Sequence, residues 1–216
     1  MFRDRSAASV FGIVLYADVE PIDLGATFGV LSMARRVLPG VRAVTLAAQA
    51  GVVMLAGGLR VEAEHGLDEA PALDVVIVTG GAGWPDAAVD PAMLRFLRGR
   101  PAGIVASVCT GAMILQGAGL LRGRATTRRM ALGAETVSPL ARLGDCGIEA
   151  LVVDGGDVVT GGGVSLAADT TLHLLARLYG DEAAAEVARA IEYDRAWAAN
   201  RAALPTIRSV SEVEAA

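Results

Sequence analysis

The sequence predicts an α/β protein whose mostly parallel sheet is covered by helices on both faces. Apolar runs of strand length alternate with helical patterns along the chain, as is typical of this class. Hydrophobic residues make up 53% of the chain and aromatic residues only 4%, so the core must be built mostly from Ala, Val and Leu. Such side chains suit strands that are buried on both faces. A length of 216 residues fits one domain, which we expect over residues 1–208.

Three strands are expected in the first part of the chain, because three apolar runs are bounded there by polar or turn residues. They cover residues 10–15, 41–47 and 74–79. A helix is expected over residues 24–37, because apolar residues fall at helical spacing and Pro39-Gly40 follows. Residues 51–64 contain two β-like pieces around a pair of glycines, which predicts a hairpin at the flank of the sheet.

The alternation continues through the middle of the chain. A helix over residues 91–98, with Asp90 as its N-cap, precedes a strand over residues 103–108. This strand leads directly into Cys109, and a helix rich in small residues is expected over residues 110–121.

The last part of the chain has weaker patterns. We expect a brief strand over 124–127, a helix over 131–143, a hairpin or two short strands over 151–160, and helices over 167–178 and 181–191. A less regular tail follows, and its last residues, 209–216, are expected to be flexible.

Charge and cysteine content exclude several functional classes. The net charge is −5 and no basic stripe occurs, so binding to nucleic acid is not expected. Cys109 and Cys146 lack the spacing of a disulfide framework, which favours a reducing cytoplasm. The polar N-terminus does not resemble a signal peptide, and no apolar run reaches membrane-spanning length. The two His and two Cys residues also lack the spacing of metal ligands.

Cys109 is the foremost candidate for a reactive residue. A residue at a sharp turn between a strand and a helix projects above the carboxyl edge of the sheet, as in a nucleophile elbow. The N–H groups of the helix N-terminus would lower the pKa of the thiol and favour the thiolate. The alternative is that Cys109 is a small buried hydrophobic residue, the usual role of a lone cysteine. Cys146 lacks this context and is expected to be structural.

Asp23 is the second candidate. It follows the first strand, so it should reach the carboxyl edge, where open α/β sheets bind ligands. A partly desolvated carboxyl group beside a thiol could hold or transfer a proton. The alternative role is that of a helix N-cap, which is common for Asp. Glu20 is a weaker candidate for the same proton transfer.

A glycine turn gives the third candidate. Gly80-Gly81 follows a strand and could present N–H groups to an oxyanion opposite Cys109, together with the amide of Thr110. The segment does not fit a dinucleotide-binding motif, because it lacks the third glycine and has Pro85 where the helix should begin. The second run of glycines, residues 161–163, is expected to be a close-packed turn.

The two histidines offer no partner for Cys109. His65 is expected in a polar turn, and His173 within a helix, packed against the core. A carboxylate and the helix N-terminus are therefore the expected activators of the thiol.

Taken together, these segments resemble the DJ-1/PfpI superfamily, which is class I glutamine amidotransferase-like, and within it the isonitrile hydratase-like branch. The matching segments are Ile22-Asp23-Leu24, Val78-Thr79-Gly80-Gly81, Ser107-Val108-Cys109-Thr110-Gly111-Ala112, Gly123-Arg124-Ala125-Thr126-Thr127, Thr160-Gly161-Gly162-Gly163 and Ala168-Asp169. The resemblance covers roughly residues 10–195, and the segment around Cys109 is its most specific part.

The resemblance implies a flavodoxin-like three-layer sandwich, commonly a homodimer, that needs no cofactor. The catalytic set of the branch carries over to Asp23, Cys109 and Thr110. The implied reaction is the addition of water to an isonitrile, which gives an N-substituted formamide. Cys109 would attack the isonitrile carbon, Asp23 would manage the proton, and Thr110 would help to hold the intermediate.

The chain departs from the branch after Thr126-Thr127, where Arg128-Arg129 stands in place of the usual His-Trp. Two permanent charges are thus expected near the mouth of the pocket. Arg128 could favour an anionic substrate or simply face solvent, and both alternatives stay open.

Two other functions also stay open. The same fold occurs as the ligand-binding half of transcription regulators, whose helix-turn-helix module lies downstream. Because this chain ends at Ala216 without a basic recognition helix, it would sense a small molecule through Cys109 and would not bind DNA. A glyoxalase or deglycase, in which Cys109 attacks a dicarbonyl, is the third function. It is less expected because Thr110 stands where that branch commonly carries His.

Overall fold

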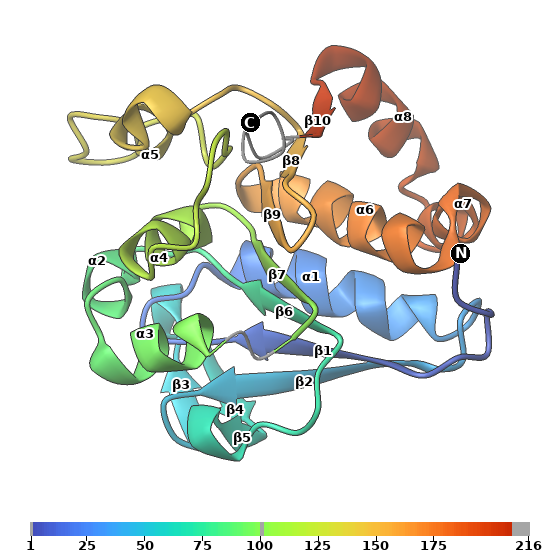
Figure 1. Cartoon of the computed structure of the whole chain (residues 1–216), viewed down its shortest axis with the longest axis horizontal. Helices are drawn as coiled ribbons and strands as arrows, with labels where there is room; N and C mark the ends of the chain where they lie inside the picture. The colour runs from blue at the N-terminus through green and yellow to red at the C-terminus, as the bar shows by residue number, and fades with distance from the viewer. Residues whose placement is uncertain (1, 100–101, 209–216) are drawn as a thin grey trace, which may run out of the picture.

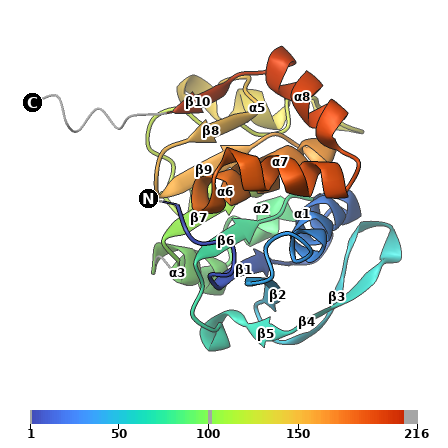
Figure 2. The same cartoon turned by 90° about the vertical axis from the view of Figure 1, so that its right-hand side faces the viewer.

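The computed structural model describes residues 2–99 and 102–208, so the tail expected over residues 209–216 lies outside the described part. One eight-stranded sheet runs through the middle, with strand order β10-β8-β9-β7-β6-β1-β2-β5 (Figures 1 and 2). Its strands are β1 (Ser9–Val14), β2 (Val41–Ala47), β5 (His65–Gly66), β6 (Val75–Val78), β7 (Ile104–Ser107), β8 (Val152–Asp154), β9 (Val158–Gly161) and β10 (Thr206–Arg208). Every pairing in it is parallel except that of β8 with β9.

Helices cover both faces of this sheet. They are α1 (Pro21–Ala34), α2 (Trp84–Ala87), α3 (Pro91–Arg98), α4 (Gly111–Gly117), α5 (Pro139–Arg142), α6 (Ala167–Tyr179), α7 (Asp181–Ala190) and α8 (Asp194–Ala203). One hydrophobic cluster joins the sheet to α1, α6 and α7, and a second joins its other face to α2, α3 and α4. The expected three-layer α/β sandwich is confirmed.

The central strands are buried on both faces, which explains their uninterrupted apolar sequences. All four residues of β6 are buried, and Ile77 packs in the first cluster while its neighbours Val76 and Val78 pack in the second. The expected hairpin at the flank is also present. It is formed by β3 (Gly51–Met54) and β4 (Arg60–Ala63), which pair antiparallel in a sheet of their own.

The topology brings three loops together at one edge of the sheet. β1 lies between β2 and β6, so the order of the strands along the chain reverses its direction across the sheet at the pair of β1 and β6. Val14 of β1 pairs with Val78 of β6, which pairs with Ser107 of β7, so the three strands end at the same level. This carboxyl edge is the place where open α/β sheets bind ligands.

The helix expected over residues 131–143 is wrong. The structure has a loop there that ends in the single turn of α5, because Ser138 caps a new helix start and Pro139 follows it. Gly133, at a φ of 59°, turns the backbone away from a right-handed helix. The strand expected over 124–127 is reduced to one bridge, between Ala125 and Gly147.

The end of the described chain is more regular than expected. α8 packs through Trp197, its one buried residue, and β10 adds a parallel edge strand to β8. The helix after Cys109 is shorter than expected and ends at Gly117, shortly before Gly119 with its φ of 72°. Within the described ranges, no helix combines the length and the apolar character that a membrane crossing requires.

Candidate active site

Asp23, Gly80 and Cys109 meet at the carboxyl edge of the sheet. Asp23 lies in the first turn of α1, Gly80 follows β6, and Cys109 follows β7. A Cβ added to Gly80 would lie 2.6 Å from Cys109 Cβ, 2.6 Å from the Thr110 nitrogen and 2.7 Å from Asp23 Oδ2. The position therefore requires glycine, since real Cβ atoms do not approach other atoms so closely.

Cys109 occupies a strained turn between β7 and α4. Its φ is 52°, in the left-handed region that residues other than glycine seldom adopt. Two contacts hold this conformation: the Cys109 N–H donates to the Gly162 carbonyl at 3.1 Å, and the Thr127 hydroxyl donates to the Cys109 carbonyl. The run of glycines at 161–163 is thus both a close-packed turn and the support of the cysteine backbone.

Asp23 points inward and does not cap its helix. Glu20 holds the N-cap position without a capping bond from its side chain, whereas Asp23 lies three residues further on and is fully buried. Asp23 Oδ2 accepts the Gly80 N–H at 3.0 Å. Its other oxygen, Oδ1, has no partner of normal hydrogen-bond geometry among the described residues. The alternative role as an N-cap is therefore wrong.

Burial dominates the electrostatics of this pair. It raises the pKa of Asp23 to about 7, although hydrogen bonds with the Cys109 thiol and the Gly80 N–H oppose the rise. Burial also raises the pKa of Cys109 to about 12, and the charge of Asp23 adds to the rise. Desolvation of the sulfur opposes the effect of the nearby N–H groups on the thiol pKa, so the thiolate expected at the helix N-terminus stays a prediction. Burial thus raises the pKa of both partners, the carboxyl group of Asp23 and the thiol of Cys109.

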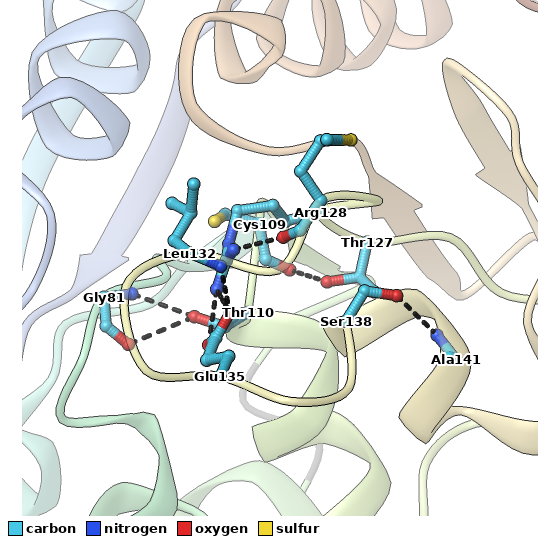
Figure 3. Close-up of polar contacts among 10 residues, drawn as sticks. Gly81, Cys109, Thr110, Thr127, Arg128, Leu132, Glu135, Ser138 and Ala141 are labelled. Carbon is cyan, nitrogen blue, oxygen red and sulfur yellow. Dashed lines mark hydrogen bonds and ion pairs between the residues drawn. The ribbon is translucent and has the colours of Figure 1, made fainter.

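The N–H groups of the glycine turn are already used within the protein. The Gly80 N–H donates to Asp23, and the Gly81 N–H donates to the Thr110 hydroxyl at 2.9 Å. Their expected role as oxyanion donors does not fit these contacts. The Thr110 hydroxyl also donates to the Gly81 carbonyl at 3.2 Å, so two hydrogen bonds hold the glycine turn against the start of α4 (Figure 3).

Two backbone N–H groups approach the sulfur instead. Those of Thr110 and Val164 both lower the pKa of Cys109, against the larger effect of burial. Val164 has a φ of 56°, unusual for a β-branched residue, and sequence reasoning missed it because a backbone N–H has no side-chain signature. Tyr16 was also missed. Its hydroxyl donates to the Thr79 carbonyl at 2.9 Å, and burial, with the charges of Asp23 and Cys109, raises its pKa well above the usual range.

Arg128 neither faces solvent nor stands free. Its side chain is only 11% exposed and forms an ion pair with Glu135, in which one nitrogen, Nη2, lies 2.7 and 2.9 Å from the two carboxylate oxygens. In Figure 3 the side chains of Arg128 and Leu132 lie beside Cys109, and the loop that carries Glu135 passes over Thr110.

The remaining sequence candidates lie elsewhere. His173 Nε2 is 2.8 Å from Asp154 Oδ2, and His65 belongs to the edge strand β5. The Cys146 thiol donates to the Leu143 carbonyl at 3.0 Å, which fits the structural role expected of it. Among residues 2–99 and 102–208, no group of three or more His, Cys, Asp or Glu residues is arranged to hold a metal ion.

A cleft of about 710 Å³ opens onto Cys109. Ile22, Trp84 and Leu132 give it apolar walls, while Glu20 and Arg142 add polar groups. A second cavity of about 640 Å³ lies next to it and shares the lining residues Arg128, Leu132 and Val164. A small, mostly apolar molecule would fit against the sulfur.

Replacing Gly80 tests the close packing of this site. Gly80→Ala is expected to lower the free energy of unfolding by about 1–3 kcal/mol, because the methyl group must displace backbone or Cys109. Gly103→Ala is the matched control: its Cβ would have one neighbour, at 3.8 Å, so a change within about 0.5 kcal/mol is expected. Urea denaturation measures both, and equal stabilities of the two variants would contradict the packing argument.

This chain is similar to a known protein family and to several known proteins. The model of the DJ-1/PfpI family matches residues 9–177. An isonitrile hydratase of Pseudomonas putida is 33% identical over 184 residues, which are 84% of this chain and 77% of that protein. The HTH-type transcriptional regulator GbdR of Pseudomonas aeruginosa is 29% identical over 198 residues, which are 89% of this chain but only 53% of the regulator.

Solved structures agree with the fold. A ThiJ/PfpI family protein from Pseudomonas syringae superimposes with a TM-score of 0.74 at 28% identity, covering 88% of this chain and 76% of that one. DJ-1beta of Drosophila melanogaster gives a TM-score of 0.73 at 19% identity and covers 86% and 98% of the two chains. The α/β fold is thus shared with proteins that differ widely in sequence.

Proposed function

This chain belongs to the DJ-1/PfpI family, and on that premise we propose that it is a cysteine-dependent enzyme that hydrates isonitriles. The observation that carries the proposal is the buried pair of Asp23 and Cys109 at the base of a mostly apolar cleft. A carboxyl group with a pKa of about 7 is suited to accept a thiol proton near neutral pH and to return it. The isonitrile hydratase of Pseudomonas putida, which aligns with most of this chain, supports the choice of substrate.

The first half of the proposed reaction forms a bond to sulfur. Asp23 accepts the proton of the Cys109 thiol while the sulfur attacks the terminal carbon of the isonitrile. That carbon then receives the proton from Asp23, which gives a thioimidate bonded to Cys109. The sulfur carries negative charge during this step and again when the carbon–sulfur bond breaks, and the N–H groups of Thr110 and Val164 lie near enough to stabilise it.

The second half releases the product. Water adds to the thioimidate carbon, and Asp23 transfers one proton of this water molecule to the substrate nitrogen. The carbon–sulfur bond then breaks, and the hydroxyl proton returns to sulfur through Asp23, leaving an N-substituted formamide. Thr110 acts through its two hydrogen bonds with Gly81, which keep the glycine turn in place beside Asp23 and Cys109.

A turnover assay tests the proposal. Purified protein is incubated with an alkyl isonitrile, and the formyl proton of the formamide is followed by NMR. Formamide production above the rate without protein supports the proposal. An isonitrile that is recovered unchanged, with intact protein and a reduced Cys109 thiol, would exclude it.

A ligand-sensing domain is the second candidate. It is favoured by the alignment with GbdR, which covers 89% of this chain but only about half of the regulator. The same assay separates the two candidates, because a sensor would bind the small molecule tightly and release it unchanged. Mass spectrometry of the recovered ligand gives the answer.

The proposed assembly is a homodimer formed through the outer face of α1. Ile22 and Phe28 are 51% and 38% exposed there, and a Cβ at Gly25 or Gly29 would have no neighbour within 4 Å. An exposed helix face without charged residues favours contact with another protein surface. Sedimentation equilibrium is expected to give twice the chain mass of 22.1 kDa, and Phe28→Glu to give a monomer. A monomeric parent protein would contradict this assembly.

A further inference from the structure

We propose that Glu135 is a specificity-determining residue that neutralises Arg128 and thereby makes the Cys109 cleft select uncharged substrates over anionic ones. The inference rests on the proposed function, because it names the substrate class of that same cleft. It also replaces both roles considered for Arg128, which was expected either to attract an anion or to face solvent.

The guanidinium of Arg128 is held inside the cleft wall. Its Nη2 donates to both carboxylate oxygens of Glu135, and its Nη1 donates to the Met130 carbonyl. Hydrogen bonds between charged groups are stronger than those between neutral groups, so these contacts hold the guanidinium against the Glu135 carboxylate. Arg128 Cβ also packs on Gly163, where an added Cβ would lie only 2.7 Å away, so the start of the side chain has little freedom to move.

Glu135 is positioned by its own loop. Its Oε2 accepts the Leu132 N–H at 2.8 Å, and its own N–H donates to the Leu132 carbonyl at 3.1 Å. The ion pair with Arg128 lowers the pKa of Glu135, so the carboxylate is charged at neutral pH. The loop thus presents a preformed negative charge to Arg128 (Figure 3).

The charge of Arg128 acts at the sulfur itself. It is one of the influences that lower the pKa of Cys109, although burial of the thiol is the larger effect. Besides Cys109, the titratable side chains that line the cleft are Glu20, Glu135, Arg128 and Arg142, two of each sign. The positive and negative charges around a substrate that reaches Cys109 therefore offset each other, and the attraction between Arg128 and an anionic substrate is weak.

Paired alkylating reagents test the proposal without any isonitrile. Iodoacetamide is neutral and iodoacetate is anionic, but both form the same type of bond with a cysteine thiol. The rate constants for Cys109 are measured in a Cys146→Ala background, and the readout is the iodoacetate-to-iodoacetamide ratio. Glu135→Gln is expected to raise this ratio by about fivefold, the effect of one uncompensated unit charge several ångströms away. Arg128→Met is expected to lower it by a similar factor.

Glu149→Gln is the matched control. Glu149 pairs with the neighbouring Arg129 at 3.4 Å, but both side chains are more than half exposed, so the ratio should stay unchanged. A loop that simply opened would change the rates of both reagents alike and leave their ratio unaltered. Ratios that stay constant in Glu135→Gln and Arg128→Met would overturn the proposal. If one of these two variants does not fold, the other still decides.

A second pair of probes joins the inference to catalysis. The neutral ethyl ester of isocyanoacetate is expected to be hydrated with a higher kcat/KM than isocyanoacetate itself, and Glu135→Gln should narrow this preference by about fivefold. A shift in the alkylation ratio without isonitrile turnover would refute the proposed function and leave the charge selection standing. Isonitrile turnover, combined with an unchanged preference for the ester and an unchanged alkylation ratio in Glu135→Gln, would support the proposed function and refute the charge selection.

Discussion

Cys109→Ala is expected to lower kcat/KM for isonitrile hydration by about four orders of magnitude or more, because no other group can form the bond to carbon. Cys109→Ser should lose nearly as much, since a hydroxyl is a far weaker nucleophile than a thiol in this buried position. The formyl proton signal in NMR measures each rate. Full activity in either variant would end the proposed mechanism.

The chain supplies its own controls for this experiment. Cys146→Ala should keep kcat/KM within about twofold, because Cys146 makes only a structural contact with the Leu143 carbonyl. Cys109→Gly separates chemistry from folding. The φ of 52° at this position suits glycine, so this variant is expected to be folded and yet inactive. An unfolded Cys109→Gly protein would mean that the thiol also supports the structure.

Asp23→Asn is expected to lose activity and gain stability. The rate should fall by about 10²- to 10⁴-fold, because the amide cannot accept the thiol proton. In the folded protein the pKa of Asp23 is raised to about 7 from 3.8, so the folded state holds this proton more tightly than the unfolded chain does. Stability contributed by Asp23 is therefore lost as the pH rises from about 4 to 7. At pH 8 the Asn variant should be more stable by about 1–3 kcal/mol in urea denaturation.

The pH profile gives an independent reading of the same residue. For the parent enzyme, kcat/KM should rise about tenfold per pH unit below pH 7 and flatten above it, as Asp23 becomes the available base. In Asp23→Asn the residual activity should instead keep rising through pH 9, because it depends on the small thiolate fraction of Cys109. Asp86→Asn, on the exposed side of α2, should alter neither the profile nor the stability. A parent profile without an inflection near pH 7 would contradict the role of Asp23.

The central strands could be predicted because strands that are buried on both faces have uninterrupted apolar sequences. Cys109 could be singled out because one such apolar run ends directly before it. α8 and β10 could not be predicted, since α8 buries only Trp197 and β10 has just three residues, of which none is fully buried. The helix expected over 131–143 had a suitable composition, but the cap at Ser138 and the turn at Gly133 decided its structure.

The meeting of Asp23 and Cys109 could be predicted, but the presence of Tyr16 and Val164 beside them and the electrostatics of the site could not. Asp23 and Cys109 could be placed at one edge from the order of the strands alone. The pKa of Cys109 could not be predicted, because it depends on how completely the sulfur is desolvated, which the sequence does not state. The pairing of Arg128 with Glu135 was equally hidden, since it forms inside an irregular loop with no periodic pattern.

The burial of Cys109 also bears on oxidative damage. Peroxide reacts with thiolates, and cysteines that sense oxidants are exposed and acidic. Cys109 is only 3% exposed, and burial raises the pKa of its thiol, so both features oppose the reaction of its sulfur with peroxide. We expect the sulfur of Cys109 to react with peroxide more slowly than the sulfur of an exposed, acidic cysteine does.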